Sequence, residues 1–115
     1  MKDYNFSFDF EGKKYEMILN LNVLKTLQDK YGTIQKWAEL TDKSNGEINI
    51  EALLFGYKEM LNEAIDISNE EKNENNPFFT EKQVGRLISK MGYDLATKRL
   101  NDAVLEGTKS DIPKN

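Results

Sequence analysis

The sequence has 115 residues, of which 38% are hydrophobic and 31% are charged, and its net charge is −4 at pH 7. Histidine and cysteine are both absent, which removes the commonest general acid/base, the thiol nucleophile, disulfides and the usual transition-metal ligands. We expect one globular domain over residues 1–107. No apolar run approaches the ~20 residues of a membrane-spanning helix, so we expect no membrane partner.

The N-terminal residues predict a β-hairpin over residues 4–19. Aromatic and polar residues alternate in the first half of this range, and a period of two is typical of a half-buried strand. Glu11-Gly12 is a two-residue turn signal. It sets a register in which apolar residues face one another: Phe8 opposite Tyr15, Phe6 opposite Met17 and Tyr4 opposite Leu19. Because two strands alone are marginally stable in water, helices should cover their apolar face.

Apolar periodicities near 3.6 residues predict about five helices within residues 21–106. Four of them follow a residue whose side chain can accept a hydrogen bond from the first helical turn. These N-cap candidates are Asn20 or Asn22, Thr33, Asn49 and Thr80. Three helices should end at a glycine, namely Gly32, Gly92 and Gly107. The predicted fold class is therefore α+β, mostly α, with an N-terminal hairpin packed on about five helices.

The strongest apolar stripe begins at Ile50 and follows the helical period to Ile65. Gly56 lies within this helix, where glycine costs about 1 kcal/mol relative to alanine, and a close crossing by another helix would explain it. In the preceding short helix we expect three residues to face the core: Ile34, Trp37 and Ala38.

Two segments have little apolar surface to bury. Residues 68–77 are rich in Asn and Glu, which predicts a mobile loop, and residues 108–115 predict a flexible tail. Between them, Thr80 and Gln83 have the spacing of a capping box, in which each satisfies a backbone donor of the other. Phe79 precedes the cap as a hydrophobic staple.

Nothing in the sequence predicts catalysis or cofactor binding. Carboxylates are plentiful, but no pair lies on an apolar helical face where desolvation could separate two pKa values. The acidic cluster from Glu70 to Glu74 lacks the ligand spacing and central glycine of a calcium loop. The glycines form neither a P-loop nor a dinucleotide-binding fingerprint. We therefore expect no catalytic, cofactor-binding or metal-binding residues, no cofactor, and a protein that is not an enzyme.

Three cations, Lys82, Arg86 and Lys90, lie four residues apart and share one face of a predicted helix. With the helix after Gly92, this arrangement could form a helix-turn-helix, so a DNA-binding regulator that uses residues 80–106 is one alternative. Asp94 would then repel phosphate near the start of the second helix, and the whole chain is acidic. We expect no nucleic-acid partner, and a basic face that meets either an acidic partner or the chain's own acidic helix is favoured.

The order and spacing of several segments match a known pattern over residues 4–107. These segments are Phe8–Tyr15, Leu19–Leu24, Lys30–Gly32, Ile50–Tyr57, Phe79–Val84 and Ala103–Gly107. Together they resemble the phage tail assembly chaperone family of long-tailed phages and prophages of Gram-positive bacteria. The resemblance implies a non-catalytic protein of the host cytoplasm that binds the tape measure protein and recruits tail tube protein during virion morphogenesis.

Our candidate partner-binding surface combines two aromatic residues before a helix with the basic face that follows them. Its members are Phe78, Phe79, Lys82, Arg86, Lys90 and Tyr93. In the simpler interpretation, Phe79 is only the staple and Tyr93 belongs to the core. A head-tail joining protein, or another small virion morphogenesis protein, is a second alternative function. Exposed aromatic residues are also compatible with a homo-oligomer.

Overall fold

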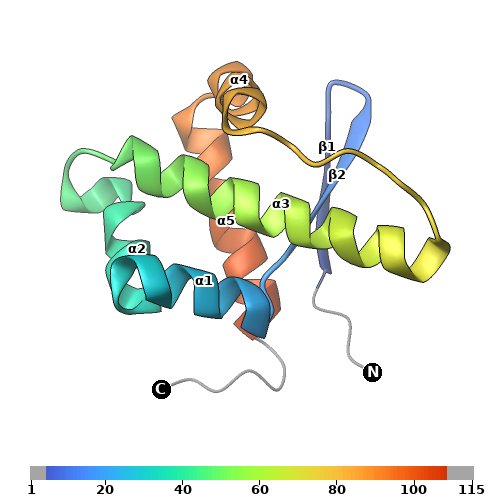
Figure 1. Ribbon diagram of the computed structural model, residues 1–115. Coiled ribbons are helices and arrows are strands. Elements are labelled where there is room, and N and C mark those ends of the chain that lie inside the picture. Colours follow the sequence, from blue (N-terminus) through green and yellow to red (C-terminus); the bar gives the residue numbers. More distant parts are fainter. Residues whose placement is uncertain (1–4, 109–115) are drawn as a thin grey trace.

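The computed structural model describes residues 5–108, which form a two-stranded hairpin followed by five α-helices (Figure 1). The elements are β1 (Asn5–Phe10), β2 (Lys13–Ile18), α1 (Leu21–Tyr31), α2 (Ile34–Leu40), a 3-10 turn (Lys43–Asn45), α3 (Ile50–Lys72), α4 (Glu81–Met91) and α5 (Tyr93–Thr108). The predicted α+β, mostly helical fold class is confirmed. Tyr4 and residues 109–115, which include most of the predicted tail, lie outside the described residues.

The hairpin has the predicted register. Phe6 pairs with Met17 and Phe8 pairs with Tyr15 in an antiparallel ladder. Glu11 and Gly12 have φ values of 52° and 79°, as expected for a two-residue turn whose twist matches that of the strands. The apolar face of the sheet packs on α3 and α5.

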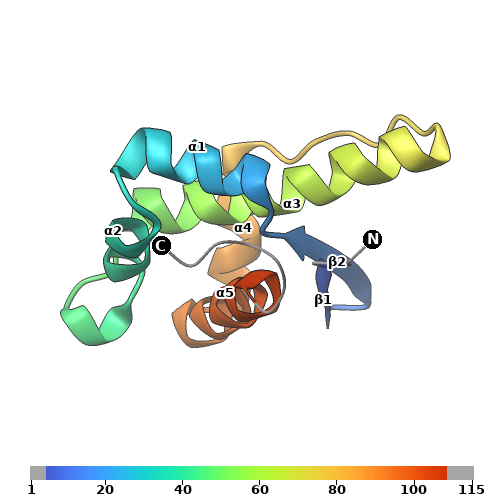
Figure 2. The same cartoon turned by 90° about the horizontal axis from the view of Figure 1, so that it is seen from below.

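Helix α3 is the central element of the molecule (Figures 1 and 2). In Figure 1, α4 lies above α3, α1 lies below it, and α5 passes behind it toward the hairpin. The N-caps are Asn20, Thr33, Asn49 and Thr80, each of which accepts a hydrogen bond from a backbone N–H of the first turn. The four predicted caps are therefore confirmed, with Asn20 rather than Asn22 at the first.

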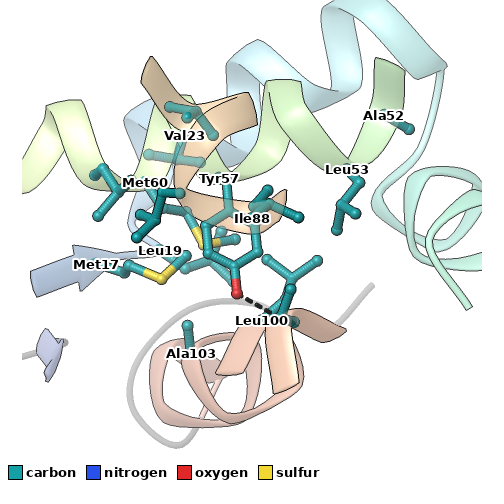
Figure 3. Packing of buried hydrophobic residues seen from close by; sticks show 14 of the residues in the cluster. Met17, Leu19, Val23, Ala52, Leu53, Tyr57, Met60, Ile88, Leu100 and Ala103 are labelled. Atoms are coloured by element: carbon teal, nitrogen blue, oxygen red, sulfur yellow. Dashed lines mark hydrogen bonds between the residues drawn. The ribbon is translucent and has the colours of Figure 1, made fainter. Parts of the chain in front are cut away.

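The core is closed by the side chain of Tyr57, which reaches from α3 toward α5 and donates a hydrogen bond to the backbone carbonyl of Ala96 (Figure 3). Burial raises the pKa of this phenol well above its ordinary value. On another side of α3, the indole of Trp37 lies against Gly56 and donates a hydrogen bond of 3.0 Å to the carbonyl of Ala52. The close helix crossing proposed for Gly56 is thus present, and α2 provides it.

Three local expectations differ from the structure. Helix α3 continues to Lys72, so the loop predicted over residues 68–77 begins only after that residue. Two hydrogen bonds of 3.0 and 2.9 Å between the Asn69 side chain and the backbone of Asn76 hold the two ends of the connection together. Gly107 does not end a helix but lies buried within α5, where a Cβ would come within 2.7 Å of the Leu19 Cβ. Ala38 is exposed rather than inward.

Candidate protein-binding site

Within residues 5–108, no group of three or more His, Cys, Asp or Glu residues is placed to hold a metal ion. Two of the grooves on the surface of these residues lie on different sides of α4. The first lies between α3 and α4, and the second lies between α3, β2 and the segment that precedes α4.

The α3/α4 groove has a volume of about 880 Å³ and a mainly apolar surface. Its lining residues are Ile50, Leu53, Leu54, Lys82, Gly85, Arg86, Ile88, Ser89, Lys90, Gly92 and Tyr93. Two large hydrophobic side chains stay open to solvent here, since Ile50 is 44% exposed and Tyr93 is 51% exposed. Four of the six predicted partner-binding residues therefore line this one groove.

The start of α4 is fixed by its capping box, which is present as predicted. The Thr80 hydroxyl accepts a hydrogen bond of 3.1 Å from the Gln83 N–H, and the Gln83 side chain accepts one of 2.9 Å from the Thr80 N–H. From this start, the helix buries Val84, Leu87 and Ile88. The helical period then leaves the three cations exposed along one edge of the groove.

The end of α4 sets the position of Tyr93. Gly92 adopts a φ of 85°, a left-handed value that favours glycine, and its N–H bonds to the carbonyl of Ile88. The chain turns there into α5, and Tyr93 is left at the rim of the α3/α4 groove. The alternative interpretation of Tyr93 as a core residue is wrong, because half of its surface is exposed.

The second groove has a volume of about 630 Å³, and it contains the other two predicted residues, Phe78 and Phe79. The Asn62 side chain bonds to both the N–H and the carbonyl of Phe79, at 2.8 and 3.1 Å. The Phe79 ring lies 6.2 Å from that of Tyr15, between centroids, and is partly buried. Phe78 is 52% exposed. The structure therefore separates the predicted surface into two parts.

The charges around the α3/α4 groove are mostly positive. Lys90 Nζ lies 3.8 Å from a carboxylate oxygen of Glu11, and both side chains are largely exposed. Lys82 and Arg86 form no ion pair with any carboxylate in the described part of the chain. Beside Tyr93, Lys43 Nζ lies 2.6 Å from a carboxylate oxygen of Asp94. Its hydrogen bond and positive charge hold the pKa of the Asp94 carboxyl below its usual value.

The sequence did not identify Ile50, Leu54 and Gly85 as groove residues. Ile50 and Leu54 belong to the apolar stripe of α3, and apolar periodicity alone does not tell a residue that another helix covers from one that stays open. The signal that could have found the hollow is Gly85. It lies beside the apolar stripe of α4, where a missing side chain leaves space.

Comparison of the chain with family models, curated proteins and solved structures finds no match. Among the helices of residues 5–108, none combines the length and apolarity needed to cross a bilayer.

Proposed function

We propose that this chain is a phage tail assembly chaperone, which binds the tape measure protein and recruits tail tube protein in the host cytoplasm. The observation that carries the proposal is the open α3/α4 groove. Ile50 and Tyr93 stay exposed along it, whereas the apolar core around Tyr57 is complete without them. Large exposed apolar side chains around a hollow are typical of a surface that binds another protein.

A groove between two helices is also the shape that receives an amphipathic helix, whose apolar stripe replaces the missing third helix of the packing. A tape measure protein is largely long amphipathic helix and would aggregate if its apolar stripe met water. A small protein that covers this stripe would keep such a helix soluble until the tail tube assembles around it.

Co-expression tests the proposal directly. The bait is the full chain, and the prey is the product of the long, helix-rich gene expected just downstream. We expect the prey to become soluble and to co-purify with the bait, and Ile50→Ser to reduce the recovered prey while the melting temperature stays close to that of the wild type. A prey that stays insoluble beside abundant soluble bait contradicts the proposal.

The same material separates the two alternatives. A head-tail joining protein would remain in purified virions, where a chaperone is not expected, and immunodetection in particles distinguishes them. A regulator that uses residues 80–106 would be retained on DNA in a strongly salt-dependent manner.

A further inference from the structure

We infer that the α3/α4 groove takes an acidic amphipathic helix, with a row of carboxylates on the partner opposite Lys82, Arg86 and Lys90. This inference adds the chemistry of the partner to the proposed function. Only the identity of the partner, the tape measure protein, rests on that function. Its evidence is the geometry and charge of this chain.

The cations form one row on the helix surface, inclined to the helix axis as every row of residues spaced by four is. Lys82, Arg86 and Lys90 are separated by four residues each, and with a rise of about 1.5 Å per residue the row spans ~12 Å. All three line the groove from the α4 side. A second helix that crosses α4 so that its own row of residues spaced by four meets this row would present carboxylates at i, i+4 and i+8 to the three cations.

The chain leaves this charge largely uncompensated. Lys82 and Arg86 have no carboxylate partner within the described residues, and the Lys90–Glu11 pair is long and exposed. Exposed pairs of that kind contribute little to stability, so Lys90 can exchange Glu11 for a partner carboxylate at little cost. A row of cations that the chain does not neutralise favours an acidic partner and disfavours a basic one.

The bottom of the α3/α4 groove is apolar, and it leaves room for a partner side chain or helix. At Gly85 an added Cβ would meet only a methyl group of Leu54, at 4.0 Å, so the backbone of α4 is open to close approach from the groove side. Ile50 and Tyr93 flank this opening with large exposed surfaces. A partner helix can therefore lay an apolar stripe on Leu54 and Ile50 while its acidic flank meets α4.

The second groove lacks this character. Polar and apolar surfaces are about equal there, and its rim mixes Lys13, Lys14 and Lys72 with Glu16. Lys13 is also engaged within the chain, since its Nζ lies 5.3 Å and 5.5 Å from the ring centroids of Tyr15 and Phe79. Because a carboxylate interrupts this rim and one of its lysines is engaged within the chain, we assign the acidic helix to the α3/α4 groove.

Two synthetic peptides test the inference with the full chain. Both have about 18 residues, enough for a helix, and the same apolar stripe. One carries Glu at three positions spaced by four residues along the flank of that stripe, and the other carries Lys at the same positions. By fluorescence anisotropy at low salt, we expect the Glu peptide to bind at least about tenfold more tightly than the Lys peptide. The preference should shrink as salt is raised, because screening weakens exposed charge pairs.

Variants locate the site. The double reversal K82E/R86E should abolish or invert the preference for the Glu peptide. The matched reversal K25E/K36E changes the net charge equally, on exposed positions away from the groove, and should leave the preference unchanged. F78S, in the second groove, should also leave it unchanged. Thermal melting of each variant checks that the fold is retained.

The inference is overturned if the two peptides bind equally, if neither binds, or if K25E/K36E acts as strongly as K82E/R86E. Loss of binding in F78S alone would move the site to the second groove and also overturn it. If the Glu peptide fails while the co-expressed partner is still solubilised, the inference falls and the proposed function stands. If the Glu peptide binds and the partner stays insoluble, the proposed function falls and the inference stands.

Discussion

Two sides of α3 show how the same helix can close a core and leave a surface open. On one side, Gly56 allows the indole of Trp37 to fill the space that a side chain would occupy. On the other side, Leu54 faces α4 at Gly85. A Cβ added at Gly85 would have only a methyl group of Leu54 within 4 Å, so the space there stays open. A small residue between two helices therefore has two opposite meanings. It marks close packing where a large neighbour reaches it and a groove where none does.

Truncation of Trp37, the large neighbour of Gly56, should have the largest effect on stability. Trp37 is 1% exposed and is anchored by its hydrogen bond to the Ala52 carbonyl. We expect Trp37→Ala to lower the free energy of unfolding by about 3–5 kcal/mol, because it removes a large buried ring and leaves a cavity beside α3. Urea denaturation measures the loss. A change below about 1 kcal/mol would show that α2 is not part of the cooperative core.

The two glycines provide the direct comparison. At Gly56 an alanine Cβ would come within 2.8 Å of the Trp37 Cε2, so Gly56→Ala should destabilise the fold by about 1–3 kcal/mol through overpacking. Gly85→Ala meets only ordinary contact and should stabilise the fold by up to about 1 kcal/mol, since alanine is the better helix former. Opposite signs in paired denaturation curves are the expected result. Two stabilising changes would mean that the Trp37 side chain can move aside.

The hydrogen bond from Tyr57 to α5 should have a smaller effect. We expect Tyr57→Phe to cost about 0.5–1.5 kcal/mol, the usual net value of one hydrogen bond. Because the pKa of this phenol is raised in the folded state above its ordinary value of 10.0, its contribution is fully present below pH 10 and is lost as the pH rises further, when the unfolded chain releases the proton.

The alkaline loss separates the role of Tyr57 from that of the other tyrosines. Tyr31 also has a raised pKa, mainly through burial and then through its hydrogen bond to Glu51, so the wild type loses stability above pH 10 through both. Denaturation curves at pH 8 and above pH 10 should show a smaller difference for Tyr57→Phe than for the wild type. An equal difference would assign the alkaline loss to Tyr31.

The contrast between the two sides of α3 also explains what the sequence could predict. Local signals were sufficient for the hairpin register, the N-caps and the capping box, because each depends on residues a few positions apart. The role of Gly56 needed a partner from α2, and that of Gly107 needed Leu19, both distant in sequence. The same limit applies to the site: the row from Lys82 to Lys90 followed from helical spacing, whereas the division of the six predicted residues between two grooves depends on where α3 lies.

The smallest effect on stability is expected at Phe78, whose large side chain is exposed. Phe78 and Phe79 are neighbours, but only Phe79 is held by Asn62 and packed near Tyr15. We expect Phe78→Ser to change the free energy of unfolding by no more than about 0.5 kcal/mol, as is usual for exposed positions, and Phe79→Ser to cost clearly more. Parallel thermal melts of the two variants measure the difference. If Phe78→Ser proved equally costly, the second groove would be part of the packed structure, and the α3/α4 groove would be the one surface of the two left for a partner.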